Sequence, residues 1–234
     1  TAEEYLKTDE YALAKARQED LLTNSGKKNW TIVRPSKTYG KDRIQLGAQE
    51  KETWLYETLA GYPIVVSEDI LSKCVTFSSG FDVAMGICHI LGDKRTFGEC
   101  FNVTGDKIFY WKDILMFYEE VLTANNVPYR VIRKDKWAIW QGGSFYQVKY
   151  STGLNRKVSN RKLKEFYPDL KFENAEDGIR QTLDDFLKEG NYKPSINANR
   201  MLGKARYTRC FPPYNQIIGK KCKLKYFLYK LRIL

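Results

Sequence analysis

Four short runs of β-branched and aromatic residues limit what this chain can fold into. They occupy 30–33 (WTIV), 64–66 (IVV), 74–77 (CVTF) and 100–103 (CFNV). Runs of this length and composition are typical of buried strands. The stretches between them carry apolar residues at helical spacing, so strands and helices alternate along the chain. This alternation predicts an α/β fold.

Helices are expected in the intervals that these strands leave. Thr8 is a suitable N-cap for a helix that runs to Leu22, because Asp9 and Glu10 then lie at the positive end of the helix dipole. A second helix is expected over 45–60, a further strand over 129–133 and a short basic helix after Ser159. Apolar stripes predict three more helices, on Val83, Ile87, Ile90 and Leu91; on Trp111, Ile114, Leu115, Tyr118 and Leu122; and on Ile179, Leu183, Phe186 and Leu187.

Composition narrows the class of protein. The length of 234 residues is enough for one ordinary domain or a domain with an appendage, and a hydrophobic fraction of 43% is enough for a core. No stretch approaches the roughly 20 apolar residues of a membrane span. The five cysteines lie far apart without a Cys-x-x-Cys pair, which argues against disulfides and zinc and favours free thiols in the cytoplasm. His89 is the only histidine and lies in an apolar helical stretch, so we expect a packing role for it and no metal site.

The net charge of +11 is concentrated at the C-terminal end. After Glu189 there are eleven Lys and Arg and no acidic residue, whereas residues 1–189 balance 28 basic against 28 acidic side chains. A nucleic-acid-binding domain would instead carry basic residues across its folded surface. We therefore divide the chain into a neutral domain over 1–190 and a basic tail over 191–234, and expect no nucleic-acid partner.

The end of the tail, 219–234, has its own pattern. Leu224, Phe227, Leu228 and Leu231 recur at helical spacing, with lysines filling the other face. This pattern is typical of a basic amphipathic helix on an anionic membrane surface. The alternatives are a helix that docks back on the body and a disordered basic end.

The residues with the clearest chemical potential are Tyr11 and Lys15. On a helix, positions i and i+4 lie one turn apart on the same face. The lysine cation favours the phenolate, which lowers a tyrosine pKa toward the range where it exchanges protons with an alcohol or ketone. By itself a Tyr-x-x-x-Lys pattern is common, and its simplest interpretation is an exposed helix pair.

The surroundings of this pair are more specific. The segment WTIVRPSKTYG (30–40) follows the pair, SGFDVA (79–84) and FNVTG (101–105) come next, and KVSNRKL (157–163) and GIRQTL (178–183) close the series. This order resembles the extended short-chain dehydrogenase/reductase family of NAD-dependent epimerases and dehydratases, over about 1–190. The resemblance implies a Rossmann-type sheet with a small mixed α/β substrate domain.

The resemblance also implies roles for individual residues. Tyr11 would be the catalytic acid/base, and Lys15 would bind the nicotinamide ribose and tune Tyr11. Pro35 and Ser36 would lie against the nicotinamide. Arg43 and Gln45 fall where the family contacts the nucleotide sugar, and Lys73 lies near a position often used for phosphate. For Arg43 and Lys73 a solvated surface role is an equal alternative.

One part of the family pattern is missing from the sequence. The GxxGxxG turn, whose glycines let the backbone approach the pyrophosphate, does not occur, and only ten residues precede Tyr11. We therefore expect a C-terminal portion, a fragment without the dinucleotide-binding half. NAD or NADP would serve the full-length parent, and this chain alone is expected to bind neither.

The expected function is therefore that of a truncated epimerase, dehydratase or reductase acting on a nucleotide sugar, in polysaccharide biosynthesis. The alternatives are a non-catalytic binding module and an inactive fragment. A nucleotide sugar is the expected small-molecule partner, a homodimer is an option, and the expected location is cytoplasmic, with the membrane surface as an addition through 219–234.

Overall fold

The computed structural model describes residues 2–134, 145–190, 192 and 196–233. Its contacts divide the chain into two compact units, each assembled from three separate segments. Unit 1 comprises Thr1–Gly40, Val75–Phe109 and Arg156–Gly178, and unit 2 comprises Lys41–Cys74, Tyr110–Asn155 and Ile179–Leu234.

Unit 1 is built on two small sheets. Its helices are α1 (Ala2–Leu6), α2 (Tyr11–Thr23), α5 (Gly80–Ile90) and α8 (Arg161–Phe166), and its strands are β1 (Thr31–Pro35), β2 (Lys37–Tyr39), β4 (Cys74–Ser79), β5 (Glu99–Val103) and β6 (Ile108–Tyr110), with a 3-10 turn at Lys94–Thr96. β1 pairs in parallel with β5, with Pro35 opposite Val103. β2 pairs in parallel with β4, whose other neighbour is β6. Parallel strands alternating with helices confirm the predicted α/β class.

The core of unit 1 lies between α5, β5 and α8. Ile90, Phe101, Val103, Leu163 and Leu170 form its buried cluster. Gly86 lets α5 approach β5 closely, because a Cβ there would lie 2.9 Å from Val103 Cγ1.

The stripe predicted for α5 is wrong in part. The buried positions are Asp82, Gly86 and Ile90, while Ile87 and Leu91 are exposed. This helix packs through Gly86, because the missing side chain permits the close approach to β5. The prediction was based on the spacing of apolar side chains and therefore could not identify a glycine as the packing position.

Unit 2 is mainly helical. It contains α3 (Lys51–Leu59), α4 (Glu68–Leu71), α6 (Trp111–Ala124), α7 (Phe145–Gln147), a π-helical turn (Val148–Thr152), most of α9 (Ala175–Glu189), α10 (Ala198–Thr208), a 3-10 turn (Tyr214–Gln216) and α11 (Lys220–Lys230), with the strands β3 (Ile64–Ser67) and β7 (Val131–Lys134). β3 pairs in parallel with β7. The rings of Trp54 and Tyr118 stack in its core, with centroids 4.8 Å apart.

Two predicted helix starts are shifted. The helix expected over 45–60 begins only at Lys51, because Leu46 and Gln49 bond through their backbones around Gly47, which has φ +61°. The N-cap of α2 is Glu10, whose carboxylate accepts from the Ala12 amide at 2.9 Å, and Thr8 instead accepts from the Glu10 amide.

The plain packing role predicted for His89 is reduced in the structure to a single ring contact at the surface. The side chain is exposed on α5, where Nδ1 lies 2.8 Å from the Met85 carbonyl oxygen and the ring meets the edge of Tyr167. The five cysteines, all in the described part of the chain, are free thiols. Within the described ranges no helix has the length and hydropathy needed to cross a membrane.

Candidate functional site

Tyr11 and Lys15 lie side by side in the first turns of α2. Lys15 Nζ is 5.7 Å from the centroid of the Tyr11 ring and donates a hydrogen bond to Gln18 Oε1 at 3.2 Å. Tyr11 is 70% exposed. The expected juxtaposition of phenol and ammonium is therefore present, and its phenol faces solvent.

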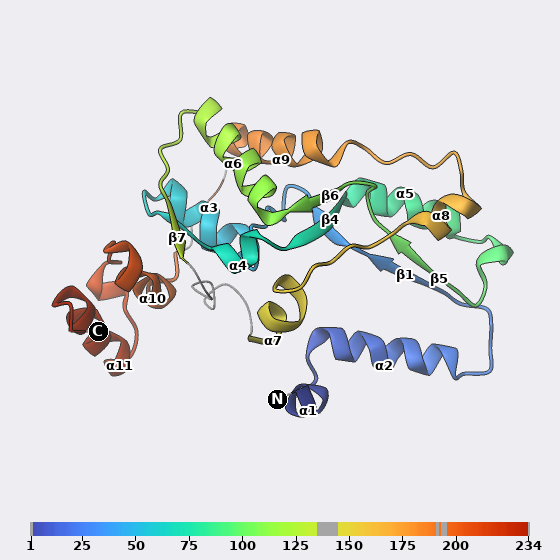
Figure 1. Cartoon of the computed structure of the whole chain (residues 1–234), viewed down its shortest axis with the longest axis horizontal. Helices are drawn as coiled ribbons and strands as arrows, with labels where there is room; N and C mark the ends of the chain where they lie inside the picture. Colours follow the sequence, from blue (N-terminus) through green and yellow to red (C-terminus); the bar gives the residue numbers. More distant parts are fainter. Residues whose placement is uncertain (1, 135–144, 191, 193–195, 234) are drawn as a thin grey trace. The chain divides into compact units, whose positions relative to one another are not determined.

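One ion pair attaches α2 to β1. Arg34 Nε donates to Glu19 Oε1 at 2.9 Å, and the guanidinium lowers the pKa of that carboxyl below its ordinary value. No described residue of α2 is buried. α2 and β1 run in opposite directions (Figure 1). From Glu19 back to Tyr11 the helix spans about 12 Å, and from Arg34 on to Ser36 the strand spans about 7 Å in the same direction. Tyr11 is therefore expected at the end of the unit where β1 finishes.

Ser36 belongs to a polar network at the carboxyl ends of the parallel strands. Thr104 Oγ1 donates to Ser36 Oγ at 2.7 Å, and Ser78 Oγ lies 3.4 Å from the same oxygen. Ser78 in turn accepts from the Gly105 amide at 2.9 Å. Asn160 extends the network by donating to the Thr104 carbonyl at 2.7 Å. Pro35, the last residue of β1, is exposed beside it.

Sequence reasoning named Pro35 and Ser36 but missed Ser78, Thr104 and Asn160. The available signal was their position, since Ser78 lies near the end of β4 and Thr104 directly follows β5. In open α/β sheets, ligands bind outside the carboxyl ends of the strands. This network is therefore the part of unit 1 best placed to meet a bound cofactor or substrate.

Two of the family-like segments have a structural role in this fold. The Tyr39 hydroxyl, from the Tyr-Gly loop, donates to the Glu173 carboxylate, and burial together with that carboxylate raises the pKa of Tyr39. Asp82, from the Asp-Val-Ala helix start, accepts from the Glu173 amide at 3.3 Å. Both motifs thus anchor the segment before α9 to unit 1.

The three predicted substrate-binding residues lie in unit 2. Arg43 is exposed, with Nη2 3.7 Å from Glu50 Oε1, and Gln45 is buried and donates to the same carboxylate at 3.1 Å. Glu50 therefore brings Arg43 and Gln45 together. Lys73 lies between α4 and β4, where its carbonyl accepts from the Trp111 amide at 3.0 Å. The structure gives Lys73 no contact with the other two.

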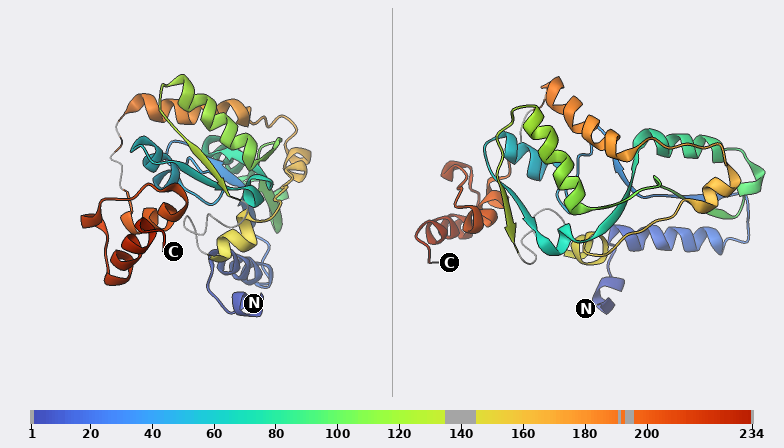
Figure 2. Two further views of the ribbon diagram at one scale, coloured as in Figure 1. Left: turned by 60° about the vertical axis from the view of Figure 1, so that its left-hand side comes forward. Right: turned by 45° about the horizontal axis from the view of Figure 1, so that its top comes forward.

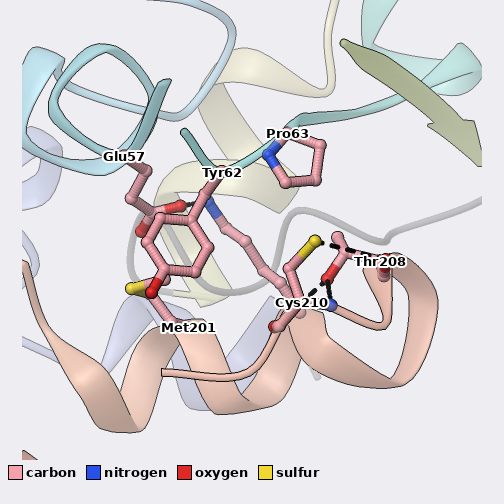
Figure 3. Close-up of a pocket in the computed structure, with 7 residues that line it drawn as sticks. Glu57, Tyr62, Pro63, Met201, Thr208 and Cys210 are labelled. Carbon is pink, nitrogen blue, oxygen red and sulfur yellow. Dashed lines mark hydrogen bonds and ion pairs between the residues drawn. The ribbon is translucent and has the colours of Figure 1, made fainter. Parts of the chain in front are cut away.

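Unit 2 also holds a buried charged centre that the sequence did not predict. Lys204 of α10 donates to Glu57 Oε2 at 2.7 Å, to the Thr53 carbonyl at 2.9 Å and to Gln49 Oε1 at 3.1 Å. Burial raises the pKa of Glu57 and lowers that of Lys204. The carboxylate lies beside a cavity of about 10 Å³. Tyr62, Met201 and Cys210 also line this cavity, and Figure 3 shows their side chains. A cavity of that size holds one water at most, which is too small for a substrate. The role of this centre is therefore structural: the bonds of Lys204 to Glu57 and Thr53 attach α10 to α3.

Among the described residues, no group of three or more His, Cys, Asp or Glu side chains is arranged to hold a metal ion. The side chains brought together by the features above offer hydroxyl, ammonium and amide groups. Tyr11 and Lys15 can exchange a proton, and Ser36 can donate or accept a hydrogen bond.

These features define an α/β protein with polar groups at the carboxyl ends of its parallel strands. No family model and no curated protein matches the sequence. Among solved structures, the chain is similar to dTDP-glucose 4,6-dehydratase from Bacillus anthracis in complex with NAD, at 16% identity and a TM-score of 0.54. It is also similar to a short-chain dehydrogenase/reductase superfamily protein from Agrobacterium tumefaciens with bound NAD, at 14% identity and a TM-score of 0.53.

The similarity covers 80% and 78% of this chain, and 55% and 58% of those two structures respectively. An epimerase from Methanothermobacter thermautotrophicus is a third similar structure, at 12% identity and a TM-score of 0.55, over 76% of this chain and 48% of that one. The chain thus spans little more than half the length of the first two. Its fold is shared with part of the extended short-chain dehydrogenases/reductases, the family that its motifs resemble.

Proposed function

We propose that the chain is the C-terminal portion of an extended short-chain dehydrogenase/reductase that acts on a nucleotide sugar. The observation that carries the proposal is the Tyr11–Lys15 pair at the start of α2. This pair is expected at the end of unit 1 where β1 finishes and the Ser36 network begins. The shared fold supports the family, and the NAD bound in two of the similar structures supports the cofactor.

In this proposal Tyr11 takes the proton from a sugar hydroxyl while the carbon that bears this hydroxyl gives up a hydride. When the resulting carbonyl is reduced, Tyr11 returns the proton to its oxygen. Lys15 would hold the nicotinamide ribose. Ser36, oriented by Thr104, hydrogen-bonds at the nicotinamide. NAD, when bound, accepts and returns the hydride, and Arg43, Gln45 and Lys73 contact the nucleotide sugar.

We further infer that a separate dinucleotide-binding half completes unit 1, because the sequence contains no GxxGxxG turn. Among the described residues, β1 has β5 as its one sheet neighbour, although the strands of parallel sheets are normally flanked and covered. The apolar side chains of Phe81 and Met85 on α5, and of Leu91 directly after it, are exposed. A parallel strand and helix added at β1 and α5 would cover this surface.

The proposal also covers the pathway, the cellular location and the oligomeric state. The domain over 1–190 acts in nucleotide-sugar metabolism that supplies polysaccharide synthesis in the cytoplasm, and the tail over 191–234 gives it a peripheral membrane position. A homodimer is compatible with these roles. A non-catalytic binding module is the second candidate, favoured by the solvent exposure of Tyr11.

The test begins with the coding sequence upstream of Thr1. We expect an in-frame strand, glycine-rich turn and helix there, and we expect the extended protein to bind NAD in a calorimetric titration while the 234-residue chain does not. Micromolar NAD binding by the 234-residue chain would show that the cradle is not missing. Absence of the upstream turn, with no NAD binding, would favour the binding module.

A further inference from the structure

Apolar side chains lie on two faces of α11, the last helix in the described part of the chain, and one of these faces is mostly exposed. α11 packs beside α10 in both figures of the whole chain (Figure 1, Figure 2). Ala198, Leu202, Ala205, Ile217 and Tyr229 form a small buried cluster there, and Cys222 and Tyr226 pack against it. The docking face of α11 is therefore the row Cys222, Tyr226 and Tyr229.

Further contacts fix this arrangement. Arg209, at the left-handed C-cap of α10, donates to the Tyr229 carbonyl at 2.7 Å. Asn199 accepts from the Ile218 amide and donates to the Ile218 carbonyl, both at 3.0 Å. Lys204 then ties α10 to α3 through its buried bonds to Glu57 and Thr53. The rotation of α11 about its own axis is therefore set by its contacts with the folded protein.

The opposite face of α11 is largely open and, apart from Lys220 in the first turn, apolar; the Phe227 ring has one neighbour there, Tyr214, with centroids 5.3 Å apart. Leu224, Phe227 and Leu231 are 60%, 48% and 68% exposed. With about 100° of rotation per residue, their mean direction lies about 180° from that of Cys222, Tyr226 and Tyr229. The stripe predicted from the sequence is thus not the docking face. A docked helix and an interfacial helix, which the sequence left as alternatives, are compatible in this fold.

Lysines border the open stripe on both sides. On the same helical wheel, Lys221 and Lys225 lie along one edge, and Lys223 and Lys230 lie along the other. Among the described residues none of these four lysines forms an ion pair, and the sequence after Glu189 offers no acidic partner nearby in the chain. An apolar strip between two rows of cations is complementary to a surface with an apolar interior and negatively charged headgroups.

We propose that this face of α11, which we call the Leu224 face, docks the protein on an anionic lipid bilayer. Leu224, Phe227 and Leu231 would enter the boundary between headgroups and acyl chains, and the flanking lysines would contact lipid phosphates. The Cys222–Tyr229 face keeps the helix attached to unit 2. The protein would lie on the membrane without crossing it.

The experiment is sedimentation of the whole 234-residue chain with vesicles of phosphatidylcholine alone, or with phosphatidylserine added. We expect binding to the anionic vesicles, weakened by salt because exposed charges are screened. Lys221→Gln with Lys225→Gln should lower the partition coefficient about 25-fold, since each cation near such a surface contributes about a factor of five. Phe227→Glu should lower it at least tenfold with the lysines retained.

Leu21→Glu is the matched control, because Leu21 is 74% exposed on α2, a helix of unit 1. This variant should bind vesicles as the parent does, and circular dichroism should show that all variants are folded. Equal binding by Phe227→Glu and the parent would overturn the proposal. The proposal would also be overturned if the parent stayed in the supernatant with anionic vesicles at low salt. Binding to single-stranded DNA, or self-association through the Leu224 face in sedimentation equilibrium, would then identify a different partner.

Discussion

Removal of the Lys204 ammonium should destabilise the protein more than removal of any exposed lysine. Lys204 and Glu57 are 6% and 2% exposed, and all three ammonium protons have acceptors within 3.1 Å. Lys204→Met leaves the Glu57 carboxylate buried without its partner, which costs about 3–5 kcal/mol of the free energy of unfolding. Glu57→Leu should cost a similar amount for the same reason. The double variant, with two apolar side chains in contact, should return to within about 1 kcal/mol of the parent or exceed it.

The assay is urea unfolding followed by tryptophan fluorescence, to which Trp54, buried on the same helix as Glu57, contributes. Lys188→Met is the control, because Lys188 pairs with Asp184 on the exposed surface of α9 and its loss should leave the unfolding midpoint unchanged. A loss below about 1 kcal/mol for Lys204→Met would refute the buried pair. Additive losses in the double variant would refute the coupling.

Two further predictions concern unit 1. Gly105→Ala would press a Cβ against the Phe77 carbonyl oxygen and should lower the free energy of unfolding in urea by roughly 1–3 kcal/mol. Gly80→Ala is the control and should be neutral, because a Cβ there would have nothing within 4 Å. Equal unfolding midpoints for the two variants would contradict the close approach at Gly105. Because Arg34 lowers the pKa of Glu19 below its reference of 4.5, their bond contributes fully above that pH and is lost as the pH falls through the lower, folded-state value. The Arg34 Nε resonance should therefore titrate with a midpoint below 4.5, and a midpoint at or above that value would mean that α2 is not held by this pair.

The strands were the most predictable part of the fold. All four apolar runs named from the sequence fall within or overlap β1, β3, β4 and β5, since a run of β-branched residues carries its own signal. The helix boundaries were less predictable because they depend on single contacts. The turn around Gly47 delays α3, and the close approach at Gly86 turns α5 away from its apolar stripe.

In the candidate site too, local relations could be predicted from the sequence and long-range contacts could not. The spacing of Tyr11 and Lys15 was sufficient to place them on one helix face, because their relation is local. The bonds among Ser36, Ser78 and Thr104 join residues 42 and 68 positions apart, so no local pattern reveals them. Lys204 and Glu57 are 147 positions apart. The rotation of α11 likewise follows from a docking row that the sequence did not distinguish from the lysine-rich face.

Turnover by Tyr11→Phe is the decisive experiment for the proposal that Tyr11 is the proton carrier of a nicotinamide-dependent sugar enzyme. In the protein joined to the dinucleotide-binding half that we propose, turnover of a nucleotide sugar should fall about 10²- to 10⁴-fold, with NAD affinity unchanged. Tyr5→Phe, which removes a hydroxyl bonded to Glu10 one helix earlier, is the matched control and should stay near the parent rate. Turnover by Tyr11→Phe within a few-fold of the parent would contradict the account and leave Tyr11 and Lys15 as an exposed surface pair.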